Sequence, residues 1–219
     1  MNVDIDATCR PRLEARRRAF LTAATEVFLE KGYSAATLDD VIARSGGSRQ
    51  TLYSLFGGKQ GLFEALMTDR CGKIFGPLSP EDLLERPPDE VLVELGTRYL
   101  EVLTSPEGLG VYRLVISESL RMRDVAERFW ELGPGRNRAL LARYFERQTE
   151  RGALKVANPQ AAAHQFWGML LGPVHVKCLL GLREPPDAAE IDTIVRGAVA
   201  QFLDGCRPDH RTGDRRPTA

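Results

Sequence analysis

The chain has 219 residues, 43% of them hydrophobic, and its 30 Lys and Arg residues equal its 30 Asp and Glu residues in number. This length and apolar content exclude an intrinsically disordered chain and allow one or two folded domains. The balanced charge gives no general indication of a polyanionic partner, so charge has to be examined locally.

The first predicted helix begins at Arg12 and ends before Gly32, which can supply a left-handed C-terminal cap. Residues 1–9 show no helical periodicity and are predicted to form a mobile arm. The first turns of the helix carry three consecutive arginines, residues 16–18, which can contact phosphate groups or form a solvated face. The apolar residues of this helix fall on one stripe: Leu13, Phe20, Ala24, Val27 and Phe28.

Two short amphipathic helices are predicted next, separated by a Ser-Gly-Gly-Ser break. Thr37 can cap the first helix, and Asp40, three residues later, completes a capping box. Gly46 can end that helix in a left-handed conformation, and Ser48 can cap the second helix. The outer face of the second helix is polar throughout: Arg49, Gln50, Thr51, Tyr53 and Ser54.

These polar side chains suit the major groove of DNA. Arg can pair with guanine and Gln with adenine, and hydroxyl groups suit phosphates or base edges. The pattern is typical of a helix-turn-helix with residues 48–56 as the recognition helix, although an ordinary surface hairpin is an alternative. From residue 10 to residue 60 the chain carries nine basic and five acidic residues, which is a modest local excess of positive charge.

A connecting helix is predicted to begin at Lys59, after the Gly57-Gly58 pair. Lys59 would lie beside unpaired backbone N–H groups at the helix start, where it can meet a phosphate.

The segment TLDDVIARSGGSRQTLYSLFGGKQGLF, residues 37–63, resembles the DNA-binding signature of the TetR/AcrR family of bacterial transcriptional regulators. It departs from that signature at Gly47, where the family usually has an apolar residue, and at Leu55, where a His is common. Gly47 should loosen the turn and remove a small packing contact. The matching positions are Thr37, Ile42, Ala43, Gly46, Ser48, Thr51, Leu52, Tyr53, Phe56, Lys59 and Leu62. The chemistry and the resemblance together predict the DNA-contact residues Thr37, Ser48, Arg49, Gln50, Thr51, Tyr53 and Lys59.

The remainder of the chain is predicted to be helical, with a break or sharp kink at Gly133-Pro134-Gly135 and a kink at Pro173. The predicted fold is all-α with about nine to ten helices. A three-helix helix-turn-helix domain comprises residues 1–70, followed by the end of the connecting helix and a Pro-rich linker at 71–88. A larger ligand-binding and dimerisation domain comprises residues 89–205, and residues 206–219 are predicted to be a flexible tail.

The last two predicted helices, residues 158–181 and 187–204, carry more apolar surface than one chain needs. We expect them to form a four-helix bundle with a second copy, and the resemblance implies the same homodimer. Two recognition helices related by a two-fold axis would meet half-sites about 34 Å apart on double-stranded DNA. The preferred operator should therefore be roughly palindromic.

We expect a repressor that leaves its operator when a small-molecule effector of unknown identity binds the C-terminal domain. An activator would use the same recognition helix, so the sequence leaves both alternatives open. The rival hypothesis is an all-helical dimeric carrier or small-molecule-binding protein with a vestigial DNA-binding head. A pocket for an apolar effector would combine aromatic and sulfur-containing residues with a few polar ones. The candidates are Tyr99, Tyr112, Glu118, Trp130, Phe145, His164 and Met169.

The sequence gives little support for an enzyme, a metal site or a cofactor. His175 and Cys178 lie three residues apart and can share a helix face, but two ligands do not make a structural zinc site. The four cysteines are scattered, and the chain shows no secretory leader, so a reduced cytoplasmic location is expected. The longest apolar run, residues 166–180, is short for a membrane span and is predicted to be a buried helix.

Overall fold

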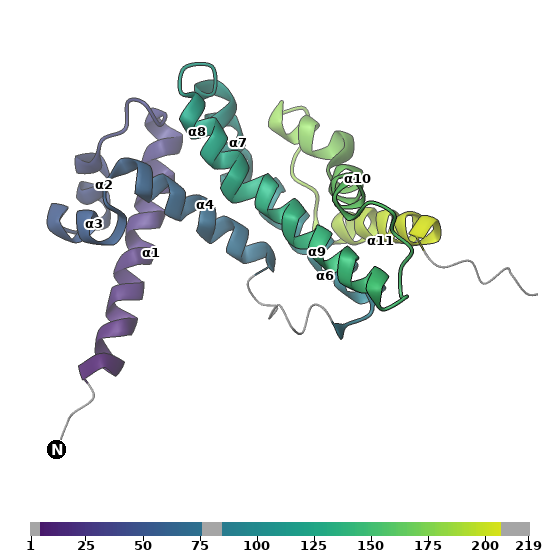
Figure 1. The fold of residues 1–219 in the computed structure, drawn as a ribbon. Helices are drawn as coiled ribbons and strands as arrows, with labels where there is room; N and C mark the ends of the chain where they lie inside the picture. Colours follow the sequence, from purple (N-terminus) through teal and green to yellow (C-terminus); the bar gives the residue numbers. More distant parts are fainter. Residues whose placement is uncertain (1–4, 76–84, 207–219) are drawn as a thin grey trace, which may run out of the picture. The chain divides into compact units, whose positions relative to one another are not determined.

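The computed structural model describes residues 5–75 and 85–206, and all regular structure in these ranges is helical (Figure 1). The predicted all-α class is therefore confirmed. A π-helical segment, η1 (Glu131–Gly135), joins two of the α-helices. The α-helices are α1 (Ile5–Lys31), α2 (Leu38–Ser45), α3 (Arg49–Phe56), α4 (Lys59–Phe75), α6 (Pro88–Thr104), α7 (Pro106–Glu118), α8 (Arg123–Trp130), α9 (Arg136–Glu150), α10 (Pro159–Leu179) and α11 (Ala188–Cys206).

One predicted boundary is wrong. Helix α1 begins at Ile5, so residues 5–9 extend the helix instead of forming an arm. At Gly133-Pro134-Gly135, where a break or sharp kink is predicted, the chain passes through the π-helical segment η1, which contains Pro134. Residues 76–84 of the predicted linker and residues 207–219 of the predicted tail lie outside the described ranges.

Helix α10 has the kink that the sequence predicted near Pro173. The backbone leaves helical geometry one residue earlier, at Gly172, where φ is 40° and ψ is −150°.

The described helices include none with the length and apolar character of a membrane-spanning segment.

The chain forms two compact units. The first unit contains residues up to Gly72 together with Ser105–Pro134, and the second contains Lys73–Thr104 together with the chain from Gly135 onward. By compactness α7 and α8 group with the helix-turn-helix, whereas the predicted ligand-binding segment, residues 89–205, includes them. The reason is hydrophobic: the core of the first unit includes apolar side chains of both helices, namely Val111, Leu114, Val115 and Val125.

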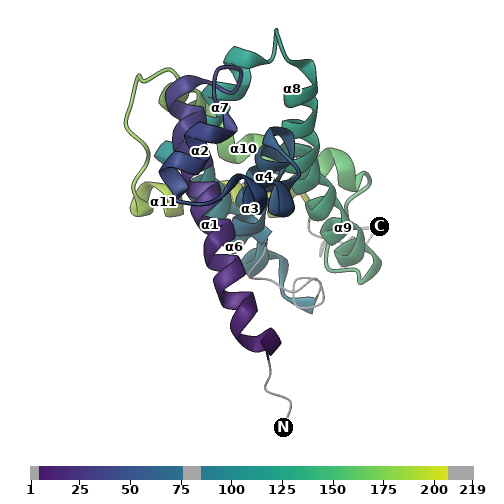
Figure 2. The same cartoon turned by 90° about the vertical axis from the view of Figure 1, so that its left-hand side faces the viewer.

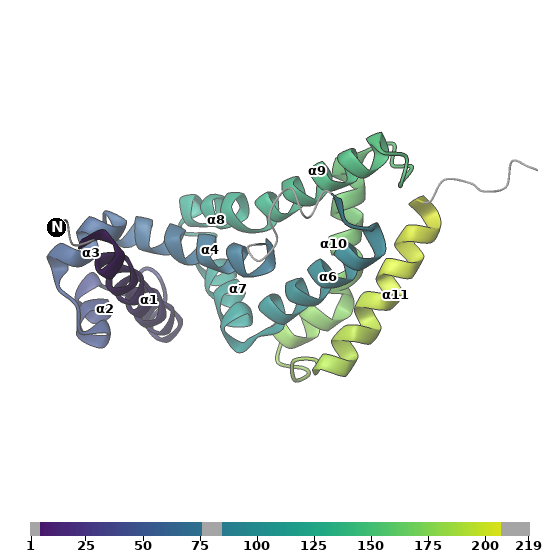
Figure 3. The same cartoon turned by 90° about the horizontal axis from the view of Figure 1, so that it is seen from below.

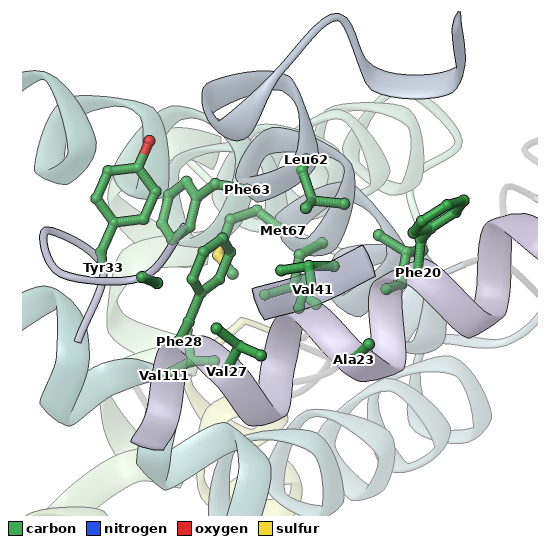
Figure 4. Close-up of a cluster of buried hydrophobic side chains, with 14 of the residues drawn as sticks. Phe20, Ala23, Val27, Phe28, Tyr33, Val41, Leu62, Phe63, Met67 and Val111 are labelled. Atoms are coloured by element: carbon green, nitrogen blue, oxygen red, sulfur yellow. The ribbon is translucent and has the colours of Figure 1, made fainter. Parts of the chain in front are cut away.

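Helix α1 forms the centre of the first unit, as Figure 4 shows. Phe20, Val27 and Phe28 are at most 1% exposed and contact apolar side chains from α2, α3 and α4. Phe20 meets Phe56 edge to face, with ring centroids 6.0 Å apart. This packing holds the two short helices α2 and α3, which are too short to be stable alone.

Phe20 also explains the unusual glycine of the turn. A Cβ atom placed on Gly47 would lie 2.2 Å from Cζ of Phe20, so the phenyl ring occupies the space that a larger side chain would need. The expected loss of a packing contact at this position is therefore wrong, because Phe20 supplies the contact from α1.

The second unit consists mainly of α6, α9, α10 and α11, which pack against one another (Figure 3). Trp167 of α10 is 1% exposed, and its ring lies 4.1 Å from that of Tyr99 on α6, centroid to centroid. Phe202 of α11 stacks on Phe145 of α9 at 5.1 Å and meets Phe166 at 5.3 Å. Each of the four helices thus contributes at least one aromatic side chain to the core of the second unit.

Candidate nucleic-acid interface

The start of α2 is fixed by the predicted capping box. The backbone N–H of Asp40 donates to Oγ1 of Thr37 at 3.2 Å, and Oδ2 of Asp40 accepts from the backbone N–H of Thr37 at 3.0 Å. Lys31 donates to Oδ1 of Asp40 at 2.7 Å. The hydrogen bonds that the carboxylate accepts, first from Lys31 and then from the hydroxyl and backbone N–H of Thr37, lower the pKa of Asp40 to about 2. The carboxylate therefore stays charged and holds the loop between α1 and α2.

Helix α3 has one apolar face and one polar face. Leu52 and Phe56 are buried, whereas Tyr53 is 47% exposed. Oγ of Ser48 accepts from the backbone N–H of Thr51 at 3.1 Å, which confirms the predicted N-cap. Gln50 and Arg49 are exposed on the outer side. Figure 2 shows α3 at the surface of the first unit, with α1 and α2 beside it.

Arg49 has an acidic partner that the sequence did not indicate. Its Nη2 lies 2.5 Å from Oδ1 and 2.6 Å from Oδ2 of Asp39, in the first turn of α2. Both side chains are more than half exposed. Three of the five guanidinium N–H donors, on Nε and Nη1, lie outside this contact and can bind a further acceptor.

Lys59 is bound within the first unit. Its Nζ donates to the backbone O of Ser34 at 3.1 Å and lies 4.7 Å from the ring centroid of Tyr33. Partial burial lowers the pKa of Lys59, and the negative charge of Glu118 opposes this effect. A phosphate contact by Lys59 would have to be shared with these partners.

Glu118, predicted to line an effector pocket, instead binds the loop between α1 and α2. Its Oε2 accepts from Oγ of Ser34 at 2.5 Å, and its Oε1 lies 3.5 Å from the backbone N of Ser34. The last turn of α7 is thereby joined to the loop that precedes α2. The sequence contained no signal for this contact, because the two residues are 84 positions apart.

The residues predicted to line an effector pocket come from both compact units. Tyr112, Glu118 and Trp130 belong to the first unit, and the other four belong to the second. In the second unit, Tyr99 and Phe145 are core residues and His164 is exposed. A surface hollow of about 260 Å³ between α6 and α11 contains none of the predicted residues. Its lining consists of Asp89, Val93, Arg196, Val199, Ala200, Leu203 and Asp204.

His175 and Cys178 are both buried on α10. The thiol of Cys178 contacts the backbone O of Glu184 at 3.5 Å. Among the described residues, no group of three or more His, Cys, Asp or Glu side chains is placed to hold a metal ion.

Comparison with known protein families gives one match in the N-terminal part of the chain and one in the C-terminal part. Residues 20–66 match the family described as bacterial regulatory proteins, tetR family. Residues 90–205 match the C-terminal domain of AefR-like transcriptional repressors. The second match alone covers more than half of the chain.

Individual relatives extend over most of the chain. The HTH-type transcriptional regulator SrpR of Pseudomonas putida is 24% identical over 199 residues, which are 87% of this chain and 86% of SrpR. A solved TetR-family regulator from Mesorhizobium loti has a TM-score of 0.75 at 26% identity, covering 90% of this chain and 99% of that one. The flavonoid-responsive regulator FrrA has a TM-score of 0.69 at 27% identity, covering 89% of this chain and 98% of that one.

Proposed function

The chain belongs to the TetR family of bacterial transcriptional regulators, and on this premise we propose that it is a repressor with a palindromic operator and a small-molecule effector. In this proposal the outer face of α3 enters the major groove. Arg49 and Gln50 bind base edges, and the hydroxyl groups of the interface bind phosphates or base edges. The proposed hydroxyl contacts come from Thr37, Ser48, Thr51 and Tyr53.

The observation that carries this proposal is the two-sided character of α3. Leu52 is fully buried and anchors the helix on the core of the first unit, while Arg49 and Gln50 remain exposed. A helix of only eight residues is stabilised mainly by burial of its apolar face and does not need its polar outer face for folding. Its exposed arginine and glutamine are thus available for an external partner.

We further propose that two copies associate through α10 and α11. On both helices, glycines face outward: a Cβ placed on Gly168, Gly172 or Gly197 would meet no described atom within 4 Å other than adjacent residues and the backbone of its own helix. Such positions allow the backbones of two helices to approach closely. Beyond Gly172, Val176 and Leu180 are 52% and 67% exposed, which supports an apolar contact with a second copy.

We place the effector in the second unit and propose that it is an aromatic molecule with a hydroxyl group. The ring centroid of Trp167 lies 4.1 Å from that of Tyr99 and 6.2 Å from that of Phe75. Oδ1 of Asn137, whose backbone O accepts from the indole of Trp167, is buried without a hydrogen-bond partner in the described part of the chain. A ligand hydroxyl would satisfy this acceptor. The flavonoid response of the relative FrrA supports the same class of ligand.

The effector would release the protein from its operator if it binds more tightly to a conformation in which the separation of the two α3 helices does not match the half-sites. A coupling of about 2.8 kcal/mol would lower operator affinity about a hundredfold.

The test is selection of bound duplexes from a random library by the full-length protein, followed by a screen of flavonoids and simple phenols for release. A roughly palindromic consensus and release by a phenol support the proposal. A protein that binds phenols but selects no DNA sequence would favour the rival carrier function.

A further inference from the structure

Helix α1 continues well beyond the part of it that is buried. Residues 11–19 are exposed or half-buried, and the first buried residue after them is Phe20. In Figures 1 and 2, this N-terminal half runs past α2 and α3 of the same unit. An exposed helical extension of this kind is available to a partner of the first unit.

The arginines of this extension are not distributed evenly around the helix. Arg16 and Arg17 precede Phe20 by four and three residues, so they lie on the face that packs against α2 and α3 one turn later. Arg12 precedes Arg16 by four residues and continues the same row. Arg18 lies away from that face. Glu14 lies three residues before Arg17 and four before Arg18, so it neighbours both arginines.

The row begins beside the recognition helix. Nη1 of Arg16 lies 3.3 Å from the backbone O atoms of both Ser45 and Gly46, in the turn that leads to the N-cap of α3. Arg12 is exposed and Arg17 is partly exposed. Within the described side chains neither makes an ion pair. Positive charge therefore continues from the start of α3 along this part of α1.

We propose that Arg12, Arg16 and Arg17 form a second DNA-contact surface, which binds the phosphate backbone flanking the half-site that α3 reads. This inference rests on the proposed operator binding. Duplex DNA is the partner that fits, because a major groove occupied by α3 brings the adjacent backbone past the turn to which Arg16 is attached. The guanidinium group suits phosphate through paired N–H donors. The surface adds affinity and salt dependence and does not read sequence.

The test compares two versions of one duplex that the wild-type protein has selected from a random library. The short version ends at the outer edges of the half-sites, and the long version adds about one helical turn of unrelated sequence on each side. We expect wild-type protein to bind the long duplex more tightly and with a steeper salt dependence. Arg12→Ala/Arg17→Ala should lose this advantage, with the slope of log K against log salt shallower by about 0.9 per contact removed.

Arg17→Ala and Arg18→Ala form a matched pair, because they remove the same charge from adjacent positions on different faces of one helix. We expect only Arg17→Ala to weaken binding of the long duplex, with neither change affecting the short one. Equal effects of the two changes, or equal wild-type affinity for both duplexes, would overturn this inference and leave reading by α3 intact. Failure of wild-type protein to select any duplex would overturn the proposed function itself, and this inference with it.

Discussion

The carboxylate of Asp39 holds the guanidinium of Arg49, with Nη2 of the arginine 2.5 and 2.6 Å from the two carboxylate oxygens. The pair joins the first turn of α2 to the first turn of α3 on the outer surface. Because both side chains are exposed, the pair contributes little to folding stability. Its effect should appear in DNA recognition, where it fixes the direction of the arginine fork and places a negative charge near the DNA.

Asp39→Asn should therefore make binding stronger but less selective. Loss of the negative charge favours every duplex, whereas loss of the fixed arginine orientation lowers discrimination at the guanine contact. The measurement is the ratio of affinities for the selected duplex and a scrambled duplex at one salt concentration. Asp39→Glu, which keeps the charge, should restore part of the ratio. If Asp39→Asn left this affinity ratio unchanged, Asp39 would act only by repelling DNA of any sequence and would not orient Arg49.

Arg49→Ala and Gln50→Ala should each cost about 1–3 kcal/mol in operator binding and relax base preference at one position per half-site. The reason is the loss of a bidentate contact with one base pair. Repeating the duplex selection with each variant shows which position has relaxed. Ser54→Ala, also exposed on α3, is the control and should leave the consensus unchanged. Retention of the full consensus by Arg49→Ala would show that α3 is oriented differently in the groove.

Gly47→Val, which introduces an apolar residue of the kind common in the family, should destabilise this protein by about 1–3 kcal/mol. The new side chain would collide with the ring of Phe20, which already lies within 2.2 Å of the Cβ position. Denaturant unfolding measures the cost, and Phe20→Leu/Gly47→Val should recover part of it. Additive effects of the two changes would show that the ring does not fill the space beside the turn.

The interface shows which features a sequence can reveal. The caps at Thr37 and Ser48 were predictable because each involves residues within three positions. The Asp39 to Arg49 pair depends on the angle between two helices, and the contact of Ser34 with Glu118 depends on α7 packing against α1. Periodicity does not report such contacts. Composition alone selects the predicted pocket residues, which come from both units, so their grouping stays a prediction.

Asp40 should make the unfolding stability depend on pH in acid. Folding lowers its pKa from 3.8 to about 2, mainly through the hydrogen bond from Lys31. The stabilising contribution is therefore present above the unfolded value and is lost as pH falls toward the folded one. Asp40→Asn should flatten the stability profile in that range, as measured by denaturant unfolding at a series of pH values. Glu14→Gln, on the projecting part of α1, is the control, and an equal flattening there would contradict the assignment.

Gly197→Leu should produce a folded protein that no longer dimerises. Within one chain the new side chain has free space, because a Cβ at Gly197 meets nothing within 4 Å, so the helical content and unfolding midpoint should be kept. Between two copies, the same side chain would hold the α11 helices apart and prevent the close approach proposed above. Sedimentation velocity measures the oligomeric state, and operator binding should fall because one α3 helix would have to bind alone. Gly72→Leu on α4, also unobstructed, is the matched control and should remain dimeric. A Gly197→Leu protein that sediments as a dimer with unchanged operator affinity would place the contact between copies on another surface.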